Sequence, residues 1–501
     1  MATPLTPREI RNLGATGLLR RVQVDDALIP DTSVEEVKNM HFDRVGAVTV
    51  RPGLATLGAT AAIGATGFYT LSCVGLHNAQ AGTIVAVFSN GSTSAIYSYN
   101  GTSWAASLDG GTASVRMRFV DFGSYTIALN FIQNTYASMR FWNAGSSRHW
   151  HNTGNPINPQ NMWGYSPQIG EIYKSRVYLF GDNTPGGSGA VASNSSRLFF
   201  SSVISATGNI TWAPGADYVD INPGDGESGT GLKRYGPELL CFKPNYTYRF
   251  KTTGVDPDPL ITVGTRSHES IVEGTRGLYF HHDSGFYRYS GGYPVKISKP
   301  ILDVTDAIPF SQYESIIAWK DKENILWSIG NVTVTERKES VTYRNAVVRY
   351  TESSDVWTLY SYAQDIRRGI TYTRGSTLAR VVATDNGIVA TFDSGTTDFN
   401  MPINYRMRTK WYEWDGFFNR KVLQELCIYA EKAQGMKFGY QVDEDTSWRP
   451  LAELQKLTNF IQKQVIQFHR IRFQVHGVSR GEVPVFLGFD ILKGINEGIV
   501  D

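Results

Sequence analysis

The sequence predicts an all-β protein: a β-propeller of about seven blades, an N-terminal extended arm and a C-terminal antiparallel β-sandwich-like domain. Between residues 170 and 392, short apolar strands alternate with Gly, Asn and Asp turns. Glycine is abundant, at 49 of 501 residues, and charged residues make up only 19%. Because strand–turn–strand repeats are typical of radially repeated β folds, and glycine supplies the positive φ angles of tight turns, both observations favour a propeller.

Residues 1–60 are expected to form an arm or a partial β element rather than a domain. Pro7 suits the first position of a helix, so residues 6–10 are expected to open a short helical turn. Residues 18–24 and 41–50 have the composition of strands. Because such an arm cannot bury its apolar residues alone, we expect it to add a strand to a blade or to a neighbouring subunit.

Residues 61–400 are expected to form the propeller, with about 48 residues per blade, near the kelch-type period. Asn90-Gly91 and Asn100-Gly101 separate apolar runs and indicate tight hairpin turns, since both residue types tolerate positive φ. Seven groups of strands are expected, at residues 83–104, 115–142, 177–212, 238–250, 278–289, 316–358 and 370–392.

Residues 401–501 are expected to form the C-terminal β domain. Residues 471–475 alternate apolar and polar side chains, as a strand with one wet face does. A short helical turn is expected at residues 451–456. Further strands are expected at residues 423–429, 436–442, 465–475 and 484–492. Together these strands predict a small antiparallel sandwich.

Composition argues against several classes of function. The net charge of +2 is nearly neutral, whereas a protein that grips nucleic acid by its phosphates usually has a basic excess. Cys73, Cys241 and Cys427 are far apart, so buried free thiols are expected rather than disulfides or a zinc site. Without an apolar leader or a long apolar run, no signal peptide or membrane-spanning segment is expected. We therefore expect folding in a reducing cytoplasm.

Two glycine-rich segments contain residue types found in binding sites. Residues 205–212 approach the Asp-box of sialidase-like propellers, but Thr207 stands where that motif has Asp, and such boxes are turn structures. Four carboxylates crowd the next loop: Asp217, Asp220, Asp225 and Glu227. These oxygens could hold Ca²⁺, although their spacing departs from the EF-hand pattern. A solvated turn between blades is the favoured interpretation.

Histidines and aromatic runs also occur in patterns that binding sites use. His149 and His151 would share one side of a strand, as metal ligands can, but no third ligand is identifiable. His281 and His282 would point to opposite faces, so shared ligation is not expected. Three aromatic runs have the composition of stacking platforms, at residues 246–248, 286–289 and 411–414. Core or interface packing is favoured for these runs because their alternation fits strands.

Two common catalytic motifs are missing from the sequence. It contains no Walker loop and no His-Glu-x-x-His. We therefore expect a protein that is not an enzyme, and we assign no catalytic, cofactor-binding or metal-binding residues. A propeller glycosidase remains an alternative, because some active sites leave no linear motif.

Residues 24–30 and 38–53 resemble the opening of bacteriophage tail-hub and nozzle propeller proteins. In the second run an asparagine-led strand at Asn39 carries an acidic residue and a glycine turn, and Arg51-Pro52-Gly53 closes it. Three later passages resemble the same group: residues 178–182 with 197–201, residues 236–243, and residues 279–292.

The resemblance implies a structural protein of a tailed double-stranded DNA phage, placed in the tail of the virion. Copies would form a homo-oligomeric ring, expected to be a hexamer, that continues the DNA channel below the portal and adaptor. Such a nozzle or hub would contact portal, adaptor and tail fibre or spike proteins. It would help to retain and release the genome, which passes without sequence-specific binding. A receptor- or glycan-binding propeller on the virion surface or tail tip is the alternative.

Overall fold

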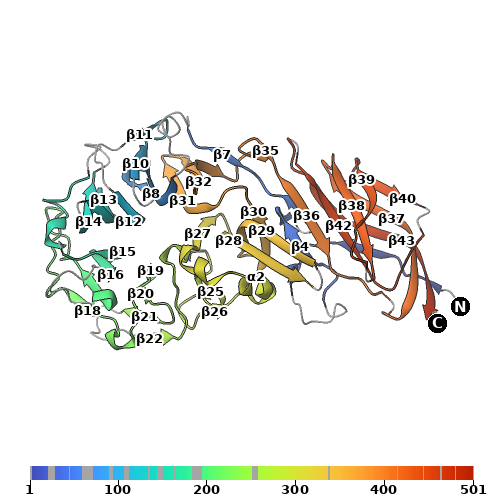
Figure 1. Cartoon of the computed structure of the whole chain (residues 1–501), viewed down its shortest axis with the longest axis horizontal. Coiled ribbons are helices and arrows are strands. Elements are labelled where there is room, and N and C mark those ends of the chain that lie inside the picture. Colours follow the sequence, from blue (N-terminus) through green and yellow to red (C-terminus); the bar gives the residue numbers. More distant parts are fainter. Residues whose placement is uncertain are drawn as a thin grey trace.

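Strands dominate the computed structural model of the chain, which confirms the predicted all-β class. The structure describes residues 3–20, 29–44, 46–58, 71–89, 94–106, 112–133, 136–143, 150–162, 164–182, 194–250, 258–336, 339–414, 416–443, 445–462, 465–479 and 481–499. Helices are short, as in the five-residue α2 (Leu302–Asp306). No helix of the described residues is long and apolar enough to cross a membrane. Figure 1 shows a ring of small sheets at one end and two layered sheets at the other.

Six separate sheets form blades of a β-propeller, and each consists mainly of strands consecutive in the chain. The first three are β8 (Ser72–Ala79), β9 (Thr83–Ser89), β10 (Ser94–Tyr99) and β11 (Trp104–Ala106); β12 (Thr112–Phe122), β13 (Tyr125–Gln133) and β14 (Tyr136–Trp142); and β15 (Pro167–Tyr173), β16 (Arg176–Asp182), β17 (Arg197–Phe200) and β18 (Tyr218–Asp220). The fourth and fifth are β19 (Gly231–Tyr235), β20 (Glu238–Phe242), β21 (Thr247–Phe250) and β22 (Asp258–Ile261); and β23 (Val272–Glu273), β24 (Leu278–His282), β25 (Gly285–Tyr289) and β26 (Val295–Lys296). The sixth contains β31 (Ile366–Arg374), β32 (Thr377–Thr384), β33 (Val389–Phe392), β7 (Leu54–Thr56), β34 (Thr397–Asp398) and β35 (Met401–Pro402).

Six sheets belong to the propeller alone, so the predicted count of about seven blades is corrected to six. The strands expected at residues 316–358 do form, as β27 (Ile317–Asp321), β28 (Asn324–Glu336), β29 (Glu339–Thr351) and β30 (Val356–Ser361). They are not a separate blade, because β30 pairs in parallel with β4 (Ser33–Lys38) through Leu359 and Lys38. This sector therefore belongs to a ten-stranded sheet that continues into the C-terminal domain.

The N-terminal segment closes the ring. Strand β7 pairs antiparallel with β33, so residues near the start of the chain complete the last blade. That blade packs on the first through β31 and β8, with Tyr99 and Tyr372 in contact at the interface. Gly53 precedes β7 where the backbones nearly touch: a Cβ there would lie 1.8 Å from the carbonyl oxygen of Thr397. Only glycine fits this approach.

The C-terminal domain is a two-layer sandwich, as predicted, and apolar side chains fill the space between its layers. One layer is the second part of the ten-stranded sheet: β4, β36 (Asn404–Thr409), β42 (Ile471–Val478), β38 (Met436–Val442) and β39 (Arg449–Leu454), with β3 (Gly17–Leu18) beside β4. The other has eight strands: β5 (Met40–Arg44), β6 (Ala47–Val50), β37 (Asn419–Glu431), β40 (Thr458–Ile461), β41 (Ile466–Phe468), β43 (Val485–Ile499), β1 (Thr3–Pro4) and β2 (Arg8–Arg11). Phe473 of β42 and Phe489 of β43 meet across the layers with ring centroids 4.7 Å apart.

Both helical turns expected from sequence are wrong. Residues 8–11 form β2, which pairs with the long strand β43 and so satisfies its backbone donors in a sheet. Residues 451–454 lie within β39, paired with β38. In both places pairing with a neighbouring strand overrides a weak local helix signal.

A buried polar cluster, the Arg51 junction, holds the propeller and the sandwich together. Arg51 is 1% exposed and donates to both Asp398 carboxylate oxygens, at 2.8 and 2.5 Å, and to the Asn39 side-chain oxygen at 3.0 Å. Its guanidinium carbon lies 3.9 Å from the ring centroid of Tyr362. Asn39 donates in turn to the carbonyl of Asn404 at 2.7 Å. The junction thus links the last blade with the C-terminal layer.

Replacing Arg51 with methionine leaves the Asp398 carboxylate unpaired in the interior. We expect Arg51→Met to lower the free energy of unfolding by about 3–5 kcal/mol, because the remaining charge is buried without a partner. Arg276→Met is the matched control, since Arg276 and Asp355 form an exposed ion pair, and such pairs contribute at most about 1 kcal/mol. Urea unfolding followed by tryptophan fluorescence measures both, and equal losses would contradict the role given to Arg51.

Candidate functional site

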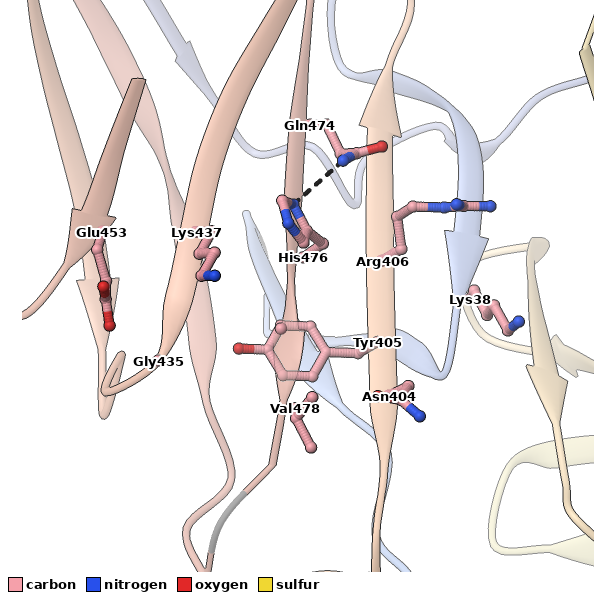
Figure 2. Close-up of a pocket in the computed structure, with 11 residues that line it drawn as sticks. Lys38, Asn404, Tyr405, Arg406, Gly435, Lys437, Glu453, Gln474, His476 and Val478 are labelled. Carbon is pink, nitrogen blue, oxygen red and sulfur yellow. Dashed lines mark hydrogen bonds between the residues drawn. The ribbon is translucent and has the colours of Figure 1, made fainter. Parts of the chain in front are cut away.

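A hollow of about 530 Å³ lies on the C-terminal part of the ten-stranded sheet, and we call it the basic hollow. Lys38, Arg406, His476, Lys437 and Glu453 contribute to its lining. Figure 2 shows these side chains on neighbouring strands, with a hydrogen bond between Gln474 and His476 that joins Nε2 and Nδ1 at 3.1 Å.

Strand register places five charged or titratable residues of the basic hollow in one row. Arg406 of β36 is directly opposite Lys38 of β4 on one side and His476 of β42 on the other. His476 is opposite Lys437 of β38, and Lys437 is opposite Glu453 of β39. Because directly opposed residues place their side chains on the same face, the row brings four basic side chains side by side.

Neighbouring charges set the electrostatics of this face. Arg406 donates to Glu36 through Nε at 2.8 Å, and Arg408 approaches the other oxygen of the same carboxylate at 3.1 Å. Burial lowers the pKa of Lys38, and the guanidinium groups of Arg406 and Arg344 lower it further, against the opposing effect of Glu36. Positive charges therefore outweigh the one shared carboxylate at this end of the row.

A second charged cluster lies across the middle of the propeller. Arg118 of β12 donates to both carboxylate oxygens of Glu269, at 2.8 and 3.0 Å, and to the carbonyl of Gln168 at 3.0 Å. Glu269 lies just before the fifth blade and β12 belongs to the second, so the ion pair joins blades that are not neighbours. Burial opposes ionisation of Glu269, but Arg118 and Arg368 hold its pKa well below the usual range.

The four carboxylates of the glycine-rich loop do not gather around one point. Asp225 accepts from Nζ of the fully buried Lys243 at 2.6 and 2.8 Å. Asp220 pairs with Arg197 at 2.8 Å. Glu227 accepts from the backbone amide of Asn245 at 3.1 Å. These contacts satisfy three of the four carboxylates separately. No group of three or more His, Cys, Asp or Glu suited to a metal occurs in the part of the chain that the structure describes.

The Asp-box-like segment is a turn. The Ser205 hydroxyl accepts from the amide of Asn209 at 3.0 Å and lies 2.9 Å from the Thr207 hydroxyl. Trp212 is buried, and its Nε1 donates to the carbonyl of Ile157 at 2.9 Å. The segment therefore shapes and anchors a loop of the third blade.

The remaining candidates pack within the protein. His151 bridges to Phe141, whereas His149 and Asn90 lie outside the described residues. Phe286, Trp411, Tyr412 and Trp414 are all buried, which confirms core packing for the second and third aromatic runs; in the first, Tyr248 is buried and Tyr246 partly so. Cys73, Cys241 and Cys427 are buried free thiols, as expected.

Comparison with known proteins adds no family: no family model and no curated protein sequence matches the chain. Among solved structures it is similar to YCF48 from Cyanidioschyzon merolae, at 11% identity and a TM-score of 0.38, over 64% of this chain and 95% of that one. It is similar to the Pan2 WD40 domain from Neurospora crassa, at 8% identity and a TM-score of 0.37, over 68% and 95%. It is also similar to the extracellular domain of the putative hybrid two component system BT4673 from B. thetaiotaomicron, at 10% identity and a TM-score of 0.41, over 82% of this chain and 47% of that one. At such values these similarities carry no functional conclusion.

The pH dependence of the unfolding free energy tests the buried environment of His281. His281 packs edge-on against Phe286 and Tyr313, and burial lowers its pKa from 6.5 to about 3. At pH values between about 3 and 6.5, unfolding therefore takes up a proton at His281. The contribution of the neutral, buried His281 to stability is full above pH 6.5 and declines as the pH falls. We expect His281→Phe to reduce the acid-side loss of unfolding free energy by up to about 1.4 kcal/mol per pH unit.

Urea unfolding at pH 7.5, 5.5 and 4.5 measures how the unfolding free energy changes with pH in the wild-type protein and in the His281→Phe variant. Histidine NMR of the wild-type protein is the second readout, and a His281 ring that titrates near its ordinary pKa would contradict the assignment.

Proposed function

We propose that this chain is a structural component of a tailed-phage virion and not an enzyme. Several copies form a ring, the nozzle or hub of the tail, which continues the DNA channel below the portal and adaptor and helps to retain and release the genome. The observation that carries the proposal is the ten-stranded sheet, whose strand order runs from β27 through β30 to β39 and in which β30 meets β4 at the Leu359–Lys38 pair. Backbone hydrogen bonding thereby joins propeller and sandwich into one body, as a ring subunit under mechanical force requires.

The residues of the resemblance support the same proposal. Asn39, Arg51 and Gly53 resemble the opening of nozzle and hub proteins, and these residues build the joint between the two parts of the chain. Their role in this chain is therefore mechanical: they fix the angle at which the sandwich leaves the propeller.

We place the DNA inside the ring of copies and not along the axis of one propeller. The Arg118–Glu269 ion pair spans the middle of the propeller between blades that are not neighbours. The near-neutral net charge of +2 suits a passage through which DNA slides, since dense cationic surfaces would hold its phosphates.

Exposed apolar side chains on the sandwich supply a surface for contacts between copies or with other virion proteins. Phe460 is 65% exposed on β40, an edge strand of the eight-stranded sheet, and Ile499 is 75% exposed at the end of β43. Val465 and Phe418 are exposed in the same domain. Natural proteins protect edge strands from unwanted pairing, so an apolar residue on such an edge marks a contact surface.

We expect purified protein to form rings in electron micrographs and Phe460→Glu to abolish them, because the carboxylate cannot be buried in an apolar contact. Leu378→Glu is the matched control, since Leu378 is exposed on β32 of the propeller, and it is expected to leave the rings intact. Light scattering on the same samples gives the mass of each species.

Sixfold density around the tail axis of intact particles would place the ring in the virion. A wild-type protein that stays monomeric at all concentrations and binds host cells saturably would contradict the proposal and favour a receptor-binding propeller.

A further inference from the structure

We infer that the basic hollow is a binding site for a phosphate group, carried by free phosphate or by a small phosphate monoester. The inference goes beyond the proposed role in the virion and does not depend on it. Lys38, Arg406, His476 and Lys437 stand in directly opposed positions on four adjacent strands. Opposed like charges destabilise a sheet, so this row costs stability unless an anion lies over it.

The balance of charge on this face fits a dianion. Lys38, Arg406, Arg408 and Lys437 lie with two carboxylates, Glu36 and Glu453, on these strands. A third carboxylate, Glu35 of β4, is neutralised by its own ion pair with Arg472 of β42. Glu36 is already shared by the two guanidinium groups, and Glu453 is at the far end of the row. Two positive charges are left, and a phosphate monoester carries about 1.5–2 negative charges at pH 7.

A neutral donor adds to the site. Asn404 lines the hollow with an exposed side chain that is free to donate. Tyr405 also contributes to the lining, but it is adjacent to Arg406 in β36, so its side chain points to the opposite face of the sheet and packs in the core of the sandwich. Phosphate accepts several hydrogen bonds at once, which suits a mixture of charged and neutral donors.

A second hollow on the same domain provides the contrast. It measures about 520 Å³, and its charged lining consists of Lys432 and Lys456 with Glu431 and Glu482. The two positive and two negative charges of the second hollow cancel. The two hollows are similar in size, so it is the excess of basic side chains that distinguishes the basic hollow. Its volume of about 530 Å³ exceeds that of a phosphate ion and leaves room for the remainder of a small molecule.

Protonation of His476 should be linked to binding. Burial lowers its pKa, and the charges that face it, Lys437 from β38 with Arg406 and Arg408 from β36, lower it further. A bound dianion adds negative charge and raises this pKa, so binding of the dianion is accompanied by proton uptake at His476.

Calorimetric titration of the full chain at low ionic strength tests the site with inorganic phosphate and with glucose 6-phosphate. Lys437 is exposed, so Lys437→Gln should fold normally and weaken phosphate binding at least tenfold. Lys456→Gln, in the second hollow, should leave the affinity unchanged. Tighter binding of glucose 6-phosphate would assign a monoester, and tighter binding of inorganic phosphate would assign the free ion; either supports the site.

Three results would overturn the inference. These are no binding of either probe to the wild-type protein, equal weakening in the two lysine variants, and acetate binding as tight as phosphate binding. Histidine NMR supplies an independent readout, because phosphate must raise the pKa of His476. A His476 resonance that ignores saturating phosphate would place any binding elsewhere.

Discussion

Strand β4 is bonded on both sides, to β30 of the propeller sector and to β36 of the sandwich, and the arrangement of the two parts depends on this pairing. On the propeller side, β3 pairs with Ser33 and Val34 at the start of β4, and β30 pairs with Lys38 at its end. Unpaired buried amides are costly, so each of these partners contributes to the stability of β4. The buried Arg51 side chain binds both Asn39 and Asp398, and Asp398 is 347 residues from Arg51 in the sequence. The closed ring and the continuous sheet thus leave no flexible linker where propeller and sandwich meet along β4.

The local part of this fold was predictable from sequence, and the non-local part was not. Glycine and asparagine turns located central strands of each blade, because a hairpin is fixed by residues close in the chain, but edge strands such as β8, β15 and β19 were not predicted. The pairing of Lys38 with Leu359 carries no such local signal, which is why the sector β27–β30 was expected to be a separate blade. The same limit explains residues 8–11 and 451–454, where strand partners distant in sequence decided the structure.

The candidate site shows the same contrast between features with a local sequence signal and features that depend on strand pairing. Its basic residues come from four strands whose register brings Lys38, Arg406 and His476 into line, and register cannot be derived from a single sequence. The spacing of Arg406 and Arg408 by two residues, on one face of a strand, is the one local signal. By contrast, the solvated turn favoured for the loop carboxylates is not what forms at two of them: Asp220 lies in β18, and Asp225 neutralises a buried lysine. Such a partner is visible only in three dimensions.

The central claim is that propeller and sandwich form one mechanical and thermodynamic unit through β4. Differential scanning calorimetry of the wild-type chain tests it most directly. One cooperative endotherm, with equal calorimetric and van't Hoff enthalpies, is the predicted result. Two resolved transitions, one for each part, would contradict it.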